Sequence, residues 1–249
     1  MLTFNDINKG YNGHAALDSI SFSIQKEKTT ILIGPSGCGK STILKLVAGL
    51  IQADSGSVSI DGQDIRTEMI NRLRHRIGYV IQDGGLFPHL NAMENITLVA
   101  KYLKWHGDRI STRLQELSRL FRFPETLFKR YPHELSGGQQ QRISLMRALM
   151  LDPDLLLMDE PLGALDPMIR YDLQRELKDI FQELKKTVLL VTHDMGEAAF
   201  LGDEIIIMRE GRLVQQGELQ DLLERPREAF VGEFIHAQSS HWALLGQGA

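Results

Sequence analysis

The segment with the clearest chemical signal is a glycine-rich loop that ends in a lysine and a serine. The pattern G-x-x-x-x-G-K-[ST] is satisfied by Gly34-Pro35-Ser36-Gly37-Cys38-Gly39-Lys40-Ser41, between an apolar run at 29–33 and a predicted helix over 40–50. Glycines let successive backbone N–H groups turn toward an anion, and a helix N-terminus adds the positive end of its dipole. A chance glycine-rich turn does not account for the strand and the helix on either side. The sequence therefore predicts a nucleotide phosphate site, in which Lys40 reaches the β- and γ-phosphates and the Ser41 hydroxyl takes one Mg²⁺ position.

A second signal is a pair of carboxylates after an apolar run. Asp159 and Glu160 directly follow the run at 155–158. Strands often end in acidic turns, so this pattern is weak by itself and gains its meaning from the phosphate loop upstream. We expect Asp159 to hold the outer shell of the Mg²⁺ and Glu160 to polarise the water that attacks the γ-phosphate.

The composition places these motifs in an ordinary globular protein. Of 249 residues, 43% are apolar and 24% are charged, which excludes a disordered or collagen-like chain and predicts one large domain or a core with a subdomain. The single cysteine, Cys38, excludes an internal disulfide framework and favours a reducing compartment. No apolar run approaches the roughly 18 to 20 residues of a membrane-spanning helix, and the first residues lack the features of a signal peptide. We therefore expect a cytosolic protein, unless another component holds it at a membrane.

Apolar strands alternate with helices along most of the chain, with a turn expected over 54–57. The expected elements are strands at 2–25 around a turn over 9–13, at 29–33, 58–60, 77–81, 155–158, 188–191 and 205–208, a mostly helical stretch over 86–150, and a helix that begins at Asp166-Pro167. Apolar strands separated by helices predict an α/β fold with a mainly parallel sheet covered on both faces. A helical insert and a small antiparallel sheet are attached to it.

The segment Leu135-Ser136-Gly137-Gly138-Gln139 narrows the class of protein. It precedes a predicted helix with Ile143 and Leu149 on it, and it lies upstream of the Asp159-Glu160 pair. Read alone, its glycines are no more than a flexible lead into a helix. In this position, the chain resembles the ATP-binding-cassette (ABC) family of ATPases, whose signature is this pentapeptide. The resemblance covers nearly the whole chain.

The resemblance implies a P-loop nucleoside-triphosphatase core of three layers, with a small antiparallel β subdomain and a helical subdomain. The ABC ATPase domain is expected over 1–240, with the core and β subdomain at about 1–85 and 150–220 and the helical subdomain at about 86–150. Residues 241–249 are expected to form a C-terminal tail, without the CBS modules that many osmoprotectant ATPases carry. One departure is Lys26-Glu27-Lys28, where many members of the family have a Gly-Glu turn; this turn lies outside the site.

The resemblance also implies roles for individual residues. Tyr11 lies where the family stacks an aromatic ring on adenine, Gln82 matches the Q-loop glutamine that contacts Mg²⁺ and the attacking water, and His193 matches the switch histidine that touches the γ-phosphate. Residues 163–166 match the D-loop, with Gly163 where many members have serine. A tyrosine in a turn more often serves packing, and a histidine after a strand usually has no catalytic role, so both assignments depend on the resemblance.

The complete predicted site has three groups of residues. They are Glu160, His193 and Gln82 as catalytic residues; Tyr11, Gly34, Pro35, Ser36, Gly37, Cys38, Gly39, Lys40, Ser41, Thr42, Ser136, Gly137, Gly138, Gln139 and Asp166 as ATP contacts; and Ser41, Gln82 and Asp159 around Mg²⁺.

The signature implies that two chains act together. Ser136, Gly137 and Gly138 begin a predicted helix, whose N–H groups and dipole form a second anion-binding end. In this family the helical insert holds that end away from the chain's own phosphate loop. The implied assembly is a head-to-tail pair, a homodimer where the two chains are identical, with two ATP molecules at the interface. Each γ-phosphate would meet Lys40 of one chain and the signature of the other, and hydrolysis would weaken this bridge.

Importers, exporters and soluble proteins of DNA repair or translation all use such a cassette. Exporters commonly carry a membrane part on the same polypeptide, repair proteins have coiled-coil or zinc insertions, and translation-type members have two cassettes; none of these features is found in this sequence. A basic stretch is made of Arg66, Arg72, Arg74, His75 and Arg76, but the net charge of -4 and the lack of interleaved aromatic residues favour a solvated helix face. We therefore expect no nucleic-acid partner. The expected protein lies on the cytoplasmic face of the membrane, bound to separate permease subunits.

The segment after Gln82 bears on coupling and cargo. In importers of the family, the region beside the Q-loop receives a short coupling helix of the permease; alternatively, Leu86 and Phe87 pack under the helical insert. The segments 85–89, 104–105 and 130–135 look most similar to ATPases of quaternary-amine osmoprotectant importers, for glycine betaine, choline or carnitine. Such importers also use an extracytoplasmic substrate-binding protein. Importers of sulfonates, nitrate, polyamines or amino acids have similar segments and stay open as alternatives, as does a soluble, non-transport ABC ATPase.

Overall fold

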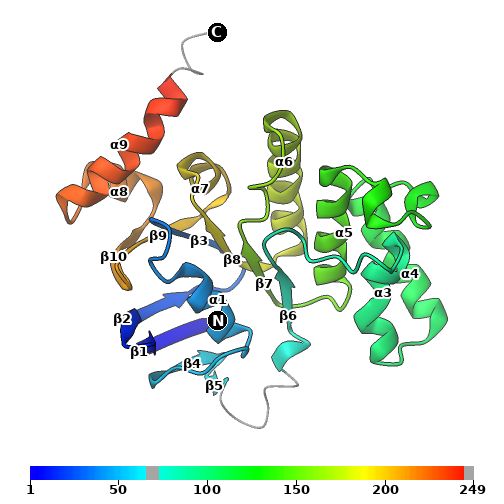
Figure 1. Ribbon diagram of the computed structural model, residues 1–249, viewed down its shortest axis with the longest axis horizontal. Coiled ribbons are helices and arrows are strands. Elements are labelled where there is room, and N and C mark those ends of the chain that lie inside the picture. Colours follow the sequence, from blue (N-terminus) through cyan, green and yellow to red (C-terminus); the bar gives the residue numbers. More distant parts are fainter. Residues whose placement is uncertain (66–72, 244–249) are drawn as a thin grey trace.

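The protein, described here from a computed structural model that covers residues 1–65 and 73–243, is built on two sheets (Figure 1). The strands of the larger sheet are β3 (Thr29–Ile33), β6 (Ile77–Val80), β7 (Leu155–Asp159), β8 (Thr187–Thr192), β9 (Glu204–Arg209) and β10 (Arg212–Gly217). Their order is β10-β9-β3-β8-β7-β6, with β10 antiparallel to β9 and every other neighbouring pair parallel. The α/β fold with a mainly parallel sheet is confirmed. Strand β10 was not predicted from the sequence.

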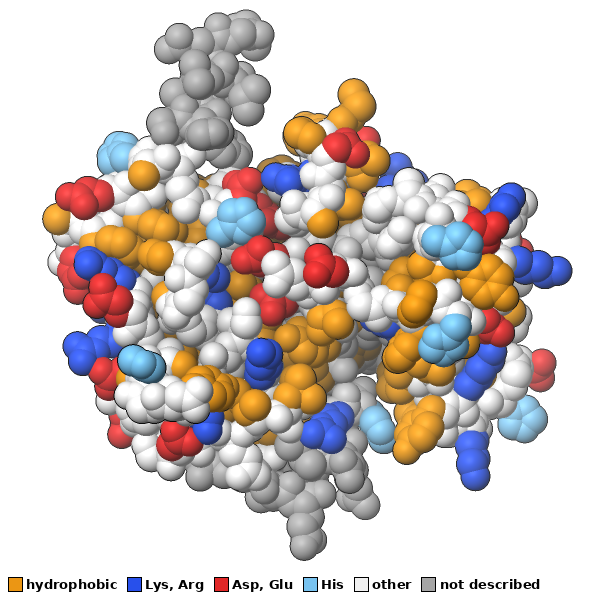
Figure 2. Space-filling model, viewed as in Figure 1, with side chains coloured by type: hydrophobic (Ala, Val, Ile, Leu, Met, Phe, Trp, Pro, Cys, Tyr) orange, Lys and Arg blue, Asp and Glu red, His pale blue; other side chains and the backbone are white. Residues whose placement is uncertain are grey.

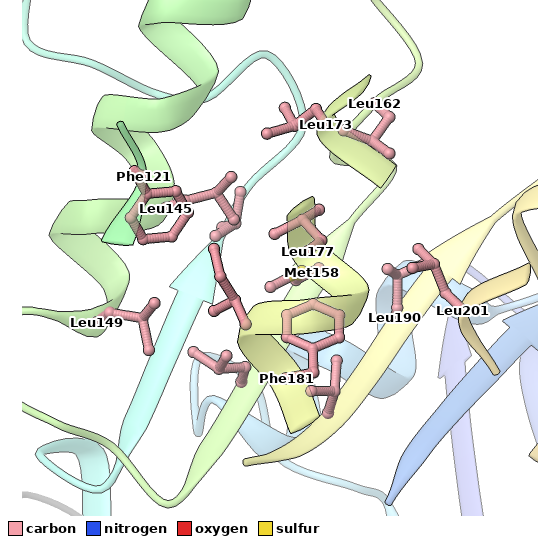
Figure 3. Close-up of a cluster of buried hydrophobic side chains, with 14 of the residues drawn as sticks. Phe121, Leu145, Leu149, Met158, Leu162, Leu173, Leu177, Phe181, Leu190 and Leu201 are labelled. Atoms are coloured by element: carbon pink, nitrogen blue, oxygen red, sulfur yellow. The ribbon is translucent and has the colours of Figure 1, made fainter. Parts of the chain in front are cut away.

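The central strands are covered on both faces. Every residue of β3, β7 and β8 is buried, and successive side chains enter two different hydrophobic clusters. One cluster holds the helices α5 (Gly137–Leu149), α6 (Pro167–Leu184) and α7 (Met195–Leu201), and Figure 3 shows Leu177 and Phe181 of α6 among Met158 and Leu190 of the strands. The other holds α1 (Lys40–Val47) and the smaller sheet. This two-sided burial is the reason for the continuous apolar runs in the sequence.

The smaller sheet is antiparallel. Its strands β1 (Leu2–Tyr11), β2 (His14–Ile24), β4 (Ser55–Ile60) and β5 (Gln63–Asp64) lie in the order β2-β1-β4-β5. Asn12 and Gly13 connect β1 to β2 with φ of 49° and 82°, as tight hairpin turns require. The turn expected over 54–57 was wrong in its extent, because Ser55 already pairs with Asn8 and begins β4.

The stretch over 86–150 is mostly helical, as expected. It contains α3 (Ala92–Tyr102), α4 (Gly107–Leu120), two short 3₁₀ turns (Glu125–Leu127 and Pro132–Glu134) and α5. Asn91 and Glu94 form a capping box at the start of α3, with each side chain accepting a 2.9 Å hydrogen bond from the other's backbone N–H. Leu114 and Leu117 bury one side of α4.

Two short elements end earlier than the sequence predicted. Helix α1 ends at Val47 rather than near Leu50, which is 60% exposed, and β6 ends at Val80, so Ile81 lies in a loop and is 41% exposed. The chain finishes with α8 (Leu219–Glu224) and α9 (Ala229–Ala243). The expected boundary at residue 240 lies within α9, and part of the expected tail lies outside the described residues. Among the described helices, none is long and apolar enough to cross a membrane.

The basic stretch is partly described. Arg66 and Arg72 lie outside the described residues. Arg74 donates to the carbonyl of Gly49 at 2.8 Å, and Arg76 joins Asp61 and Asp154, each at 2.6 Å. Hydrogen bonds to these two carboxylates raise the pKa of Arg76. The charge of Arg76 therefore serves an internal bridge between a hairpin turn and the start of β7.

The turn that departs from the family pattern has a definite backbone requirement. Glu27 has a φ of 60°, in the left-handed region that glycine adopts most easily. Its N–H donates to the Thr187 hydroxyl at 2.9 Å, which ties the turn to β8. A glycine in the family at such a turn is therefore explained by conformation rather than by contact with the site.

Strand β3 offers a test of the core. The Thr30 hydroxyl is fully buried and has no hydrogen-bond partner among the described residues, whereas the equally buried Thr187 hydroxyl accepts from Glu27. Thr30→Val removes an unsatisfied polar group, so we expect it to raise the free energy of unfolding by about 1 kcal/mol, and the matched Thr187→Val to lower it by about the same amount. Denaturant unfolding measures both changes. Loss of stability in Thr30→Val would contradict the assignment of this hydroxyl as unpaired.

Candidate nucleotide site

One open cavity of about 540 Å³ collects most of the predicted site residues. Its lining comprises Tyr11, Ala16, Ser36, Gly37, Gly39, Lys40, Ser41, Thr42, Gln82, Glu160 and His193. These come from the hairpin β1–β2, the phosphate loop, the loop after β6 and the ends of β7 and β8. The structure therefore brings together residues that are spread over more than two thirds of the sequence.

The phosphate loop is fixed by close contact with the β1–β2 hairpin. Gly39 has a φ of 103°, and a Cβ there would lie 2.5 Å from the carbonyl oxygen of Ala16, so only glycine fits. Lys40 follows as the first residue of α1 and is 7% exposed. Its ammonium donates to the carbonyls of Gly34 and Pro35 at 2.8 and 3.0 Å. The lysine is thus held over the same loop whose N–H groups form the predicted phosphate cradle.

Ser41 and Asp159 form the part of the site that suits a magnesium ion. The Ser41 hydroxyl donates to Asp159 Oδ1 at 3.2 Å, so two oxygen groups from α1 and from the end of β7 meet beside the phosphate loop. Burial raises the pKa of Asp159, against the lowering effect of its hydrogen bond with Ser41. Oxygen donors of this kind are the ligands that Mg²⁺ prefers, and Mg²⁺ commonly completes its coordination with phosphate oxygens and water. The residues present fit the ion.

Glu160, His193 and Gln82 converge on one point at the end of the sheet. Nδ1 of His193 lies 3.2 Å from Oε2 of Glu160, and Nε2 of Gln82 lies 3.5 Å from the same oxygen. Glu160 has a φ of 46°, a left-handed conformation that costs a non-glycine residue about 1 kcal/mol. Its N–H donates to the carbonyl of Val191 at 2.9 Å, which holds this turn against β8. Three side chains that accept or donate hydrogen bonds therefore face the open cavity together.

Tyr11 lies at the rim of the cavity and is 44% exposed. The Lys9 ammonium lies 5.5 Å from the centre of its ring and also pairs with Asp54 at 2.6 Å. Asp54 accepts a second hydrogen bond from the N–H of Gly10 at 2.7 Å, and the Lys9 bond lowers its pKa. The hairpin tip that presents the Tyr11 ring is thus tied to the start of β4.

The signature residues and Asp166 do not line this cavity. Ser136 is the N-cap of α5 and forms a capping box with Gln139, and Ser136 and Gly137 are exposed. Gly138 is buried, and a Cβ there would lie 2.7 Å from Ile169 of α6. Asp166 is the N-cap of α6 and accepts from the N–H of Ile169 at 3.1 Å. Within one chain these groups lie at the N-termini of two further helices, α5 and α6, outside the cavity.

Gly163, where the family often has serine, is not dictated by space. A Cβ at this position would meet its nearest neighbour, the carbonyl oxygen of Glu160, at 3.6 Å, an ordinary contact. A serine would therefore fit, and the departure leaves the turn after Glu160 unchanged.

Several residues that hold the loops of the site were not predicted from the sequence. Arg147 of α5 donates to the carbonyls of Gly84 and Gly85, both at 2.8 Å, and so ties the loop after Gln82 to the signature helix. Burial lowers the pKa of this guanidinium. Arg170 of α6 donates to the carbonyls of Gly163 and Leu165 at 3.2 and 3.0 Å. An arginine within a helix whose neighbours are apolar is the signal that could have indicated Arg147; no local pattern distinguishes Arg170.

The fold and the cavity define a P-loop nucleotide-binding protein, and comparison with known proteins gives the family. Residues 17–163 match the ABC transporter family. The choline transport ATP-binding protein OpuBA of Bacillus subtilis (strain 168) is 47% identical over 94% of this chain and 62% of its own length. The glycine betaine uptake system ATP-binding protein YehX of Escherichia coli (strain K12) is 44% identical over 94% of this chain and 76% of its own length. The chain belongs to the ABC transporter family, which confirms the resemblance seen in the sequence.

A solved structure agrees with this assignment. The ATP-binding cassette MJ0796, in a dimeric post-hydrolysis state bound to ADP and Pi, is 32% identical and matches with a TM-score of 0.79 over 88% of this chain and 99% of that chain. The core and the helical part of the fold are therefore those of an ABC cassette. The chain spans about three fifths of the length of OpuBA.

The buried carboxyl group of Glu197 predicts that the free energy of unfolding of the chain depends on pH. Burial raises its pKa from an ordinary 4.5 to about 7. A carboxyl group whose pKa is raised on folding takes up a proton, so its contribution to stability falls as the pH rises from about 4.5 to about 7 and is constant above that. The free energy of unfolding of Glu197→Gln should therefore exceed that of the native chain by an amount that grows between pH 5 and pH 8. At pH 8 this difference should be of the order of 3 kcal/mol and should appear as a higher Tm. Thermal unfolding measures it, with the exposed Glu183→Gln as control; an advantage that is constant with pH would refute the raised pKa.

Proposed function

We propose that this chain is the ATP-binding and ATP-hydrolysing subunit of an ABC importer. The observation that carries the proposal is the cavity in which the phosphate loop, Tyr11, Gln82, Glu160 and His193 meet. A helix N-terminus with glycine-rich backbone binds the phosphates, and an exposed aromatic ring lies where a base can stack. The three groups at the sheet end lie where a terminal phosphate, bound along the loop, would be attacked.

The reaction is attack of water on the γ-phosphoryl group of ATP, in line with the leaving oxygen of ADP. Glu160 accepts a hydrogen bond from the water and orients it, while Gln82 and His193 fix the Glu160 carboxylate and contact the γ-phosphate side. Lys40 compensates the charge that develops on the phosphate oxygens. Ser41, Asp159 and Gln82 would hold Mg²⁺, which when bound neutralises phosphate charge. Water attack breaks the bond between the γ-phosphorus and the bridging oxygen and yields ADP and phosphate.

We propose that two chains complete each site. The N-terminus of α5, with exposed Ser136 and Gly137, is a helix end that does not line the chain's own cavity. A second copy in head-to-tail orientation would place this end on the γ-phosphate held by Lys40. The dimeric form of MJ0796 supports such a pairing. ATP would then bridge the chains, and its hydrolysis would release them.

The cargo we propose is a quaternary-ammonium osmoprotectant. The relatives OpuBA and YehX, which match 94% of this chain, are a choline transport and a glycine betaine uptake ATP-binding protein. We propose that the chain binds separate permease subunits peripherally at the membrane and works with an extracytoplasmic substrate-binding protein. Uptake of labelled choline and glycine betaine, with sulfate as the comparison, into vesicles that contain the assembled complex tests this. Uptake of sulfate alone would contradict the osmoprotectant assignment and leave the ATPase role intact.

The loop after Gln82 supports a docking role for its apolar residues. Leu86 is partly buried against the core, while Phe87 is 42% exposed. The fully buried Asn95 holds the loop rigid, because it accepts from the Phe87 N–H at 2.8 Å and donates to the Phe87 carbonyl at 3.1 Å. The expectation of internal packing therefore applies to Leu86, whereas Phe87 faces solvent and is the residue for which we propose docking. Figure 2 shows apolar and histidine side chains gathered on the helical part of this face.

Glu160→Gln tests the chemistry. The amide keeps the shape of the side chain but is a poor acceptor for the water proton, so we expect ATP hydrolysis to fall by at least about 100-fold. Binding of ATP should stay within a few-fold, and the ATP-bound pair of chains should persist on size-exclusion chromatography. Glu210→Gln, at the exposed β9–β10 turn, is the control and should hydrolyse ATP at the native rate. Hydrolysis at the native rate by Glu160→Gln would show that Glu160 does not orient the water.

Phe87→Glu tests the docking role. A carboxylate in an apolar interface is costly to bury, so uptake by the assembled complex should fall by about 10-fold or more while ATP hydrolysis by the chain alone stays within about twofold. Tyr102→Glu, at the end of α3 and 82% exposed, is the matched control and should transport normally. A Phe87→Glu chain that fails to fold would indicate that the ring serves internal packing instead.

A further inference from the structure

Glu197 is a buried carboxyl group directly behind the turn that carries His193. It lies in the first turn of α7, is 4% exposed, and belongs to the helix that packs on β8, β3, α6 and α9. Its Oε1 has no hydrogen-bond partner among the described residues. A buried carboxyl with an unpaired oxygen lowers the free energy of unfolding. Core stability alone therefore does not explain why a carboxyl group occupies this position.

The other carboxyl oxygen acts on the residues that flank His193. The Thr192 hydroxyl donates to Oε2 of Glu197, and the same hydroxyl oxygen accepts from the Asp194 N–H at 3.1 Å. The hydroxyl has a single hydrogen, and this hydrogen points toward Glu197. The orientation of the hydroxyl is therefore fixed, with a lone pair of its oxygen directed at the Asp194 N–H. The chain Glu197–Thr192–Asp194 thus holds the backbone immediately before and immediately after His193.

Further contacts of Asp194 and Met195 hold the turn that follows His193. Asp194 caps α7, with its Oδ1 accepting from the N–H groups of Gly196 and Glu197 at 2.8 and 3.2 Å. Oδ2 of Asp194 lies 3.8 Å from Arg170, which donates to the carbonyls of the loop after Glu160. The N–H of Met195 donates to Gln238 of α9 at 2.9 Å. The side chain of His193 is 62% exposed, and the turn that carries it is held through the backbone N–H groups of Asp194 and Met195, which follow it.

We infer that Glu197 is a positioning residue for His193: through the Thr192 hydroxyl it fixes the turn that sets the imidazole at 3.2 Å from Glu160. The inference rests on the proposed function, in which His193 contacts the γ-phosphate side. A loosened turn leaves nucleotide binding to the phosphate loop unaffected, because Lys40 and Tyr11 lie on other elements. It reduces only the fraction of time that the imidazole spends in the productive position, which lowers kcat rather than raising KM.

Isosteric substitutions separate this role from packing. In the full chain, Thr192→Val keeps the shape and removes the link, so kcat for ATP hydrolysis should fall by about 10-fold or more with KM for ATP within about twofold. Thr192→Ser, which keeps the hydroxyl, should recover most of kcat. Glu197→Leu should match Thr192→Val, while Glu197→Gln, whose amide oxygen still accepts, should recover most of kcat. Thr187→Val, at the other end of β8 and equally buried, should hydrolyse ATP at the native rate.

The double variant and the native chain complete the test. Thr192→Val combined with Glu197→Leu should be no slower than either single variant, because both remove the same link. Native kcat in folded Thr192→Val and Glu197→Leu chains would overturn the inference and leave the proposed function standing. A native chain that does not hydrolyse ATP, or a His193→Ala variant as fast as the native chain, would instead refute the function on which the inference rests.

Discussion

The register of the parallel strands determines where the chemistry lies. Ile33 of β3 pairs with Thr192 of β8, Val191 of β8 with Asp159 of β7, and Met158 of β7 with Val80 of β6. The strands therefore end at nearly the same level, and the residues that follow them form a row across the sheet edge. The carboxyl ends of parallel strands lie at one edge of the sheet, so formation of the sheet alone brings these residues together. Slippage of one strand by one residue would move the predicted site residue at its end out of this row.

Two groups of predicted site residues lie apart within one chain. The cavity holds the residues proposed to bind phosphates and to orient water, but the helix end of the signature lies elsewhere, held against α6 by the close contact between Gly138 and Ile169. Arg147 connects the two regions, because it sits on the signature helix and bonds the loop that follows Gln82. The hydrogen bonds of Arg147 thereby connect the loop after Gln82, which carries Phe87, with the helix that we propose to face a second chain.

Sequence reasoning identified the strand ends well and the supporting contacts poorly. The phosphate loop and the buried strands follow from local patterns, namely a glycine-rich loop between a strand and a helix, and continuous apolar runs. The Asp159-Glu160 pair gained its meaning from the phosphate loop upstream. Tyr11, Gln82 and His193 needed the family resemblance, because their own neighbours carry no chemical signal; whether each plays the expected role stays a prediction. The links from Arg147 to Gly84 and from Glu197 to Thr192 were missed, since each depends on how separate segments pack. Strand β10 was missed because it lies at the edge of the sheet and its sequence, with Arg212, Gln215 and Gln216, lacks the apolar run that revealed the others.

Burial of a polar group near the end of a strand lowers the free energy of unfolding unless the group has a hydrogen-bond partner. Lys40, Asp159 and Glu197 are each less than a tenth exposed, and each has a partner that is weaker than a full opposite charge: backbone carbonyls for Lys40, a hydroxyl for Asp159 and for Glu197. A neutral partner satisfies a buried ion without binding it as tightly as a counter-ion would. In the proposed function this difference matters for Lys40, because a phosphate oxygen is a charged acceptor and would compete successfully with the carbonyls of Gly34 and Pro35. The lysine is thus kept folded over the loop by bonds weak enough for a nucleotide to replace.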